Sequence, residues 1–127
     1  MRNETLLHRQ INPSWIQEGR VTSQAFKPTS KDKKQLSVYD GDQISAEEAW
    51  HHYTESLHFL SAGVMAVVVS ECQDLELEVK PDPEPFPEHA IIDFSDLPNV
   101  QIEKKAKKLR EYAQARGYLY FGEAVTP

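Results

Sequence analysis

The clearest hydrophobic pattern in the chain follows Ser45 and has the period of an α-helix. Ser45 and Glu48 are spaced as a capping box, in which a hydroxyl and a carboxylate each bind a backbone N–H at the start of a helix. The pattern predicts a helix over residues 46–60 that ends near Gly63. The apolar positions within it share one sector of the helical wheel: Ala46, Ala49, Trp50, Tyr53, Leu57 and Leu60.

A second helix is predicted over residues 99–116, and Gly117 follows it where a left-handed residue commonly ends a helix. Its lysines and arginines lie away from the apolar stripe. We therefore interpret them as a solvated helix face and not as a nucleic-acid-binding surface. The stripe consists of Ile102, Ala106, Leu109 and Ala113.

The remaining apolar segments are short and predict β-strands. Residues 64–69 are uniformly apolar, which is typical of a central strand buried on both faces. Leu75, Leu77 and Val79 alternate with glutamates and predict a half-buried strand nearer an edge. Further strands are predicted over residues 5–11, 21–26, 36–39, 90–94 and 118–121.

Residues 80–87 carry a proline at every second position from Pro81, which favours an extended crossing over the surface. We do not take this segment as a domain boundary, because the chain beyond it is too short to form a second core. The sequence therefore predicts a single small α+β domain over residues 1–127. We expect a mixed β-sheet of about five to seven short strands, packed against the two helices and ending in a C-terminal β-α-β unit.

The charges are unevenly distributed along the chain. The net charge is −6, and residues 35–79 contain many acidic side chains but no Lys or Arg. Such a span attracts a basic partner or a cation and repels nucleic acid. It serves equally well as a solubility device. We therefore expect a protein partner, of which a basic protein is one example, and we expect no nucleic acid.

The sequence indicates neither a membrane nor secretion. The longest apolar run, residues 62–69, is far below the ~20 residues of a membrane-spanning helix. Residues 1–10 lack the hydrophobic region of a signal peptide. We interpret the single cysteine, Cys72, as a small buried hydrophobic residue at a strand end. These features predict a cytoplasmic protein of bacterial type.

His8 and Arg9 are neighbours in a predicted strand. Adjacent strand residues point to opposite faces, so one of the two is directed towards the core or into a cleft. A buried His or Arg needs a partner, and Ser23 and Ser37 lie in other predicted strands. A cation, an imidazole and hydroxyls together suit a phosphate- or NAD-type ligand. The alternative is a surface pair on an edge strand.

His89 and Asp93 bracket another predicted strand and point to the same side of it, because they are four residues apart. Ligands commonly bind at the carboxyl ends of strands, so Asp93 is the candidate carboxylate. The alternative is that Asp93 only accepts hydrogen bonds from backbone N–H groups before the next helix.

His51, Glu55 and His58 would share one face of the first predicted helix, as metal ligands do. Their spacing is not that of the zinc-protease motif, and they point away from the apolar sector. We interpret them as a solvated face and predict neither a metal nor a cofactor. The scattered glycines form no phosphate-binding loop, and the sequence contains no nucleophile elbow.

Two function classes remain, and the sequence does not decide whether the protein is an enzyme. The preferred hypothesis is an acidic interaction module for a larger or more basic protein, like an immunity protein, antitoxin or accessory subunit, with Trp15 and Phe86 as candidate exposed aromatic contacts. The alternative is a small enzyme or binding protein for a nucleotide, NAD-type or other phosphorylated ligand. Its site would combine His8, Arg9 and Ser37 with His89 or Asp93. A shared cleft would favour this alternative, and scattered positions would favour the interaction module.

Overall fold

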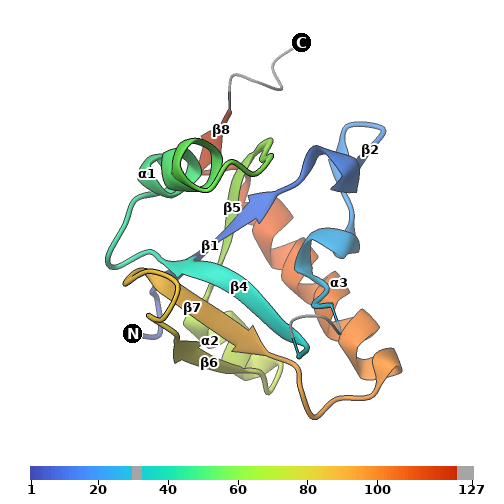
Figure 1. Ribbon diagram of the computed structural model, residues 1–127. Helices are drawn as coiled ribbons and strands as arrows, with labels where there is room; N and C mark the ends of the chain where they lie inside the picture. The colour runs from blue at the N-terminus through green and yellow to red at the C-terminus, as the bar shows by residue number, and fades with distance from the viewer. Residues whose placement is uncertain (30–32, 123–127) are drawn as a thin grey trace.

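A six-stranded β-sheet forms the centre of the protein, in the order β6-β7-β4-β1-β5-β8 (Figure 1). The computed structural model describes residues 1–29 and 33–122. The strands of this sheet are β1 (Leu6–Ile11), β4 (Gln35–Asp40), β5 (Gly63–Val68), β6 (Glu78–Pro81), β7 (His89–Asp93) and β8 (Tyr120–Phe121). A separate pair joins β2 (Ile16–Gln17) to β3 (Arg20–Val21).

The predicted class, a single small α+β domain, is confirmed. Each pairing between neighbouring strands of the sheet is antiparallel, where we expected a mixed sheet. Because β7 and β8 are separated by an even number of antiparallel steps, they run in the same direction. The helix α3 (Asn99–Arg116) connects them, so the C-terminal β-α-β unit spans the sheet from β7 to its β8 edge.

One face of the sheet carries the hydrophobic core. Leu7 pairs with Val67 across β1 and β5, and Val38 pairs with Ala90 across β4 and β7, all with side chains in the core. Helix α3 covers this face with the predicted stripe of Ile102, Ala106, Leu109 and Ala113. The 3₁₀ turn η2 (Ser23–Phe26) and the short helix α2 (Val69–Asp74) complete the core with Ala25, Phe26, Val69 and Cys72.

Helix α1 (Ala46–His51) contacts β1, β5 and β8. The predicted capping box is present at its start. The N–H of Glu48 donates to Ser45 Oγ at 3.1 Å, and the N–H of Ser45 donates to Glu48 Oε1 at 3.2 Å. Ala49 is the buried residue of this helix and is fully shielded from solvent. The start of this element therefore follows directly from the sequence.

The end of the first helix differs from the prediction. The chain continues from α1 into one π-helical turn, η4 (His52–Ser56), and the helix ends there and not at Leu60. Leu60 lies beyond this end, in no helix, and is 73% exposed. His58 has a left-handed φ of 61° where the chain turns back towards β5.

Two predicted strands are wrong in their extent. Only Val21 of residues 21–26 belongs to a strand, because the next residues form η2 and bury Ala25 and Phe26. In residues 75–79, a turn follows α2, and β6 begins only at Glu78. The alternation of leucines and glutamates there reflects this turn, in which Glu76 has a φ of 59°.

The proline-rich segment connects β6 to β7. Pro81 is the last residue of β6, opposite Ala90. A proline is tolerated there because β6 is an edge strand, whose outer side forms no hydrogen-bond ladder. Residues 82–88 then lead back to β7, with Pro83, Pro85 and Pro87 exposed. Within residues 1–29 and 33–122, no helix has the length and apolar composition needed to cross a membrane.

Candidate functional site

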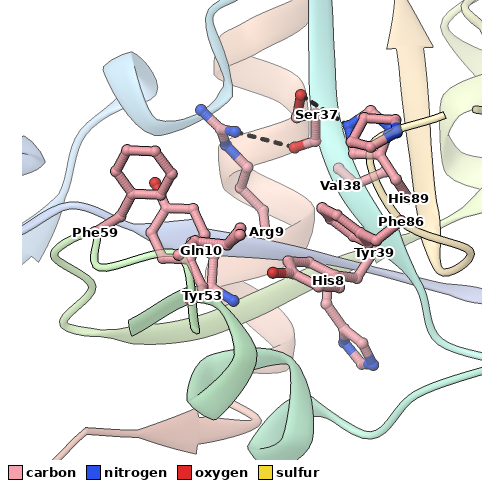
Figure 2. Close-up of a pocket in the computed structure, with 12 residues that line it drawn as sticks. His8, Arg9, Gln10, Ser37, Val38, Tyr39, Tyr53, Phe59, Phe86 and His89 are labelled. Atoms are coloured by element: carbon pink, nitrogen blue, oxygen red, sulfur yellow. Dashed lines mark hydrogen bonds between the residues drawn. The ribbon is translucent and has the colours of Figure 1, made fainter. Parts of the chain in front are cut away.

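A cleft of about 370 Å³ opens beside α1 and η4. Its base is formed by residues of β1, β4 and β7, and its walls come from η4, the segment after η4 and the β6–β7 connection (Figure 2). The lining residues are His8, Arg9, Gln10, Ser37, Val38, Tyr39, Tyr53, Leu57, Phe59, Pro85, Phe86 and His89.

The space for this cleft arises where β1 and β4 diverge. Among the described residues, their register consists of Leu7 with Asp40 and His8 with Tyr39. The strand β1 stays paired with β5 along its whole length, whereas β4 stays paired with β7. The two halves of the sheet therefore separate after His8.

Arg9 spans the gap between these strands. Its Nη1 donates to the carbonyl of Ser37 at 3.0 Å, and its Nε donates to the carbonyl of Ala25 at 2.7 Å. The guanidinium also lies over the ring of Trp15, 5.0 Å from the ring centroid. Arg9 thus binds one carbonyl of β4 and one of η2, and it brings a positive charge to the cleft lining.

Aromatic rings form two walls of the cleft. Tyr39 and Phe86 are stacked, with ring centroids 5.0 Å apart and an interplanar angle of 30°. Tyr53 and Phe59 form the second pair, with centroids 5.1 Å apart. Figure 2 shows the two pairs on either side of Arg9. A planar ring held between such walls gains stacking contacts in addition to its buried area.

Tyr39 joins the sheet to η4. Its hydroxyl lies 2.8 Å from Nδ1 of His52. Tyr39 is 4% exposed, and burial raises the pKa of its hydroxyl. The hydroxyl therefore stays protonated and forms a hydrogen bond with the imidazole. This bond fixes the position of the Tyr39 ring in the wall.

Ser37 and His89 form a hydrogen-bonded pair on neighbouring strands of the base. Ser37 is exposed, whereas His89 is 8% exposed, and Ser37 Oγ lies 3.1 Å from His89 Nε2. The other ring nitrogen, Nδ1, lies 2.8 Å from the carbonyl of Asp82 and 3.3 Å from its Oδ2. Because a carbonyl can only accept, Nδ1 carries the proton and Nε2 accepts from the serine hydroxyl.

His8 is 3% exposed, and its Nε2 donates to the carbonyl of Ile44 at 3.2 Å. Its Nδ1 is buried and has no hydrogen-bond partner among residues 1–29 and 33–122. Burial lowers the pKa of His8, against smaller opposing effects of Ile44 and Asp40. His8 is therefore neutral at pH 7, with an unpaired acceptor at Nδ1.

Gln10 and Ser61 anchor the segment that carries the second aromatic wall. Gln10 Nε2 donates to the carbonyl of Ala49 at 3.0 Å, and the hydroxyl of Ser61 contacts Gln10 Oε1 at 2.7 Å. Trp50 Nε1 donates to the carbonyl of Ser61 at 3.0 Å. These bonds fix the segment that follows η4, and with it Phe59, against β1 and α1.

The structure brings His8, Arg9, Ser37 and His89 together in this cleft, as the alternative hypothesis required. Asp93 does not line it. Asp93 lies at the other end of β7, where its Oδ1 accepts from the N–H of Ser95 at 2.9 Å. Partial burial is the largest single effect and raises the pKa of Asp93, but the hydrogen bonds from Ser95 together with the smaller effects of Lys80 outweigh it and lower the pKa.

His51, Glu55 and His58 do not share one helical face. His51 and Glu55 contact each other at 2.7 Å on the outside of the helix. His58 lies beyond the end of η4, so the helical spacing that suggested a common face does not reach it. Among the described residues, no group of His, Cys, Asp or Glu is arranged to hold a metal ion.

The sequence reasoning missed Asp82 and the aromatic walls. Asp82 lies in the segment that the sequence predicts as a proline-rich crossing. If the chain forms a hairpin there, an acidic residue shortly before His89 comes close to the imidazole. Phe86 was predicted as an exposed contact and is a half-buried wall residue. Trp15, predicted in the same way, packs under Arg9.

A comparison with known proteins finds no family model that matches the chain, and no matching curated protein or solved structure. The cleft itself is therefore the basis for proposing a function.

Proposed function

We propose that the protein binds a small molecule with a planar aromatic or heteroaromatic ring in the cleft between β1 and β4. The observation that carries this proposal is the pair of aromatic walls, Tyr39 with Phe86 and Tyr53 with Phe59, above the polar pair of Ser37 and His89. This arrangement is closer to our second hypothesis from the sequence than to the first.

The size and the composition of the cleft support a small-molecule ligand. Its volume of about 370 Å³ lies within the range of ~300–1,000 Å³ that is usual for such sites. Ligand pockets are commonly lined by apolar and aromatic side chains with a few polar groups that fix orientation. Here Ser37 and His89 would orient a polar substituent while the rings hold the planar part.

Arg9 narrows the class of ligand further. Its guanidinium gives the lining a positive charge, but its Nε and Nη1 are engaged with the carbonyls of Ala25 and Ser37. Recognition of the ring, and not a two-point clamp on phosphate, is therefore the main source of affinity. A nucleoside or a nucleotide satisfies both the stacking walls and the nearby charge.

Ligand-observed NMR with adenosine, AMP, NAD and a panel of single-ring aromatic compounds tests this proposal. We expect ring protons to receive saturation from the protein, and Phe86→Ala to weaken binding about tenfold or more through lost stacking. Phe121→Ala, which changes an aromatic residue outside the cleft, is the matched control. Absence of binding by every ring compound, or equal binding by the native protein and Phe86→Ala, would contradict the proposal.

A second candidate function is the acidic interaction module, acting in the cytoplasm on a basic protein. What supports it is an acidic hollow of about 250 Å³ at the end of β7 away from the cleft, beside the edge strand β6. Its acidic lining consists of Glu76, Glu78, Asp93 and Asp96. Such a concentration of one charge speeds encounter with a surface of the opposite charge.

A further inference from the structure

We propose that Ser37, His89 and Asp82 form a nucleophilic triad that hydrolyses esters of ring-bearing molecules held in the aromatic cleft. This inference rests on the proposed function, because the walls hold the ring while the triad acts on the ester attached to it. The activity is acyl transfer to water.

The geometry has the order of contacts that nucleophilic catalysis requires. The nucleophile, Ser37 Oγ, lies 3.1 Å from His89 Nε2, and the opposite ring nitrogen faces Asp82 at 2.8 Å (carbonyl) and 3.3 Å (Oδ2). Such a constellation is recognised by geometry and not by position in the sequence. The three residues come from β4, β7 and the β6–β7 connection, so the fold alone brings them together.

The tautomer and the exposure of the groups also fit their roles. Because the Asp82 carbonyl fixes the proton on Nδ1, Nε2 is free to accept the proton of the serine hydroxyl. Ser37 is exposed to the cleft, where a substrate can reach it, whereas His89 is buried beneath. A shielded base and an accessible nucleophile are what an acyl-transfer site needs.

The reaction proceeds in two balanced halves. His89 Nε2 takes the proton of Ser37 as Oγ bonds to the ester carbonyl carbon, and the carbonyl electron pair moves onto oxygen. The bond to the leaving alkoxide then breaks, and His89 returns the proton to it. Water attacks the acyl-Ser37 ester by the same route and releases a carboxylic acid and the free hydroxyl. One ester and one water become one alcohol and one acid.

Arg9 supplies positive charge next to the nucleophile. Its Nη1 lies 3.0 Å from the carbonyl oxygen of Ser37 itself, within the cleft lining. A fixed charge close to a developing oxyanion stabilises the tetrahedral intermediate. We assign Arg9 this electrostatic role and the positioning of β4, with no direct bond to substrate.

A fluorophosphonate probe and 4-nitrophenyl esters test the triad in the full chain. We expect one phosphonyl group to be added at Ser37, with loss of fluoride, as read by intact mass and peptide mapping. Ser37→Ala should abolish labelling and lower kcat/KM for ester hydrolysis at least ~100-fold. Ser14→Ala, a change at an exposed serine outside the cleft, should retain both. Labelling only at another residue, no labelling, or unchanged hydrolysis by Ser37→Ala would overturn the triad.

The same samples separate failure of the triad from failure of the ligand proposal. Ring binding by NMR should persist in Ser37→Ala, because the walls are unchanged. If rings bind and Ser37 is not labelled, the triad is overturned and the ligand site stands. If Ser37 is labelled and no ring binds, the triad is supported and the ligand proposal fails.

Asp82 is a positioning residue, and its test is the split between kcat and KM of ester hydrolysis. Its carboxylate lies 3.3 Å from His89 Nδ1, and Ser37 lies at the other ring nitrogen. Asp82→Asn keeps the shape of the side chain but removes the carboxylate beside the ring, so kcat should fall at least ~10-fold while KM changes little. The control, Glu84→Gln, changes an exposed carboxylate of the same connection. A kcat unchanged by Asp82→Asn would overturn this role.

Discussion

The imidazole of His8 lies against the turn that precedes α1, out of contact with solvent. One of its nitrogens bonds to Ile44, and the other has no partner within the part of the chain that the structure describes. The cost of burying a charge is avoided because the ring stays neutral, which is why burial lowers the pKa of His8. The sequence predicted that one of the neighbours His8 and Arg9 points inwards, and the residue that does so is His8.

The stability of the protein should fall as the pH decreases below about 6.5, and His8 should cause part of this loss. The unfolded chain binds a proton at the ordinary histidine pKa, whereas the folded protein binds it only at lower pH, so protonation favours unfolding in that window. The free energy of unfolding of His8→Gln, measured with urea between pH 7.5 and pH 5, should depend less steeply on pH than that of the native protein. The variant His58→Gln, at an exposed position, should keep the native slope. Equal slopes for native protein and His8→Gln would contradict this explanation.

Cys72 should be unreactive in the folded protein. It is fully buried in α2, and burial raises its pKa to about 12. At pH 8 the thiol is protonated and inaccessible, and only the thiolate reacts readily. Ellman's reagent should therefore release no thionitrobenzoate from native protein and one equivalent after denaturation in guanidinium. Rapid stoichiometric reaction of the native protein would show that α2 opens far below the free energy of global unfolding.

At the scale of single elements, α1 shows what a local signal can specify. Its start is defined by Ser45 and Glu48, which contact each other's backbone within four residues and need no distant partner. The hydrogen bonds from Ser45 lower the pKa of Glu48. Its end depends on η4 and on the turn at His58, where tertiary packing against the sheet outweighs helical periodicity.

Removal of the cap should destabilise the protein modestly. Ser45→Ala leaves the N–H of Glu48 without its side-chain acceptor and should lower the free energy of unfolding by about 1 kcal/mol. Thermal denaturation monitored by circular dichroism measures this. Ser56→Ala, at an exposed serine after the helix start, is the control. If the two variants melt alike, the capping box contributes no net stability.

The strand β5 should tolerate no charge. Val67 is fully buried between β1 and α3, so Val67→Asp would place an unpaired carboxylate in the core at a cost of several kcal/mol. A domain of this size is stable by roughly 5–15 kcal/mol, so we expect insoluble or unfolded protein. Val100→Asp is the control, because Val100 is 65% exposed at the start of α3. A soluble Val67→Asp variant with a cooperative melt would contradict the burial of Val67 in the core.

Helices and strands that carry their own hydrophobic period or cap could be predicted from the sequence. Those whose conformation depends on tertiary contacts could not. α3 has its predicted limits because its stripe and Gly117 are both local signals. α2 was not predicted, since six residues are too few to show a period, and this short helix packs against β5, β6 and α3. In the cleft, His8, Arg9, Ser37 and His89 were predicted from residue chemistry. Asp82 was not, because its role depends on the return of the chain from β6 to β7.

At the scale of the whole molecule, acidic charge gathers at a hollow outside the cleft. Glu76 and Glu78 are exposed there, next to Asp93 and Asp96. Lys80 neutralises part of this charge, since its Nζ lies 2.9 Å from Glu78 and 3.4 Å from Asp93. The hollow and the cleft therefore differ in chemistry, since the first is acidic and the second is mainly aromatic.

If the hollow meets a basic protein, reversing its charge should slow association. The double variant Glu76→Lys/Glu78→Lys should lower the association rate constant for a partner isolated by affinity purification, with little change in dissociation. The native rate should fall as salt rises, because charges are screened over about 8 Å at physiological ionic strength. Glu84→Lys/Glu111→Lys makes the same charge change elsewhere. A rate insensitive to both salt and the hollow variant would contradict the interaction module.

The gap that Arg9 spans has a consequence for how this fold can change its ligand. In a sheet with a continuous hydrogen-bond ladder, each strand is tied to the next over its whole length. Here Arg9 of β1 instead binds one carbonyl of β4 and one of η2 beside the opening, and three of the four wall rings, those of Tyr53, Phe59 and Phe86, lie outside the sheet. Replacing one of these three residues should therefore change which ring-bearing molecule binds without disturbing a strand pairing. Replacing Arg9 or Tyr39 should change the sheet beside the opening as well.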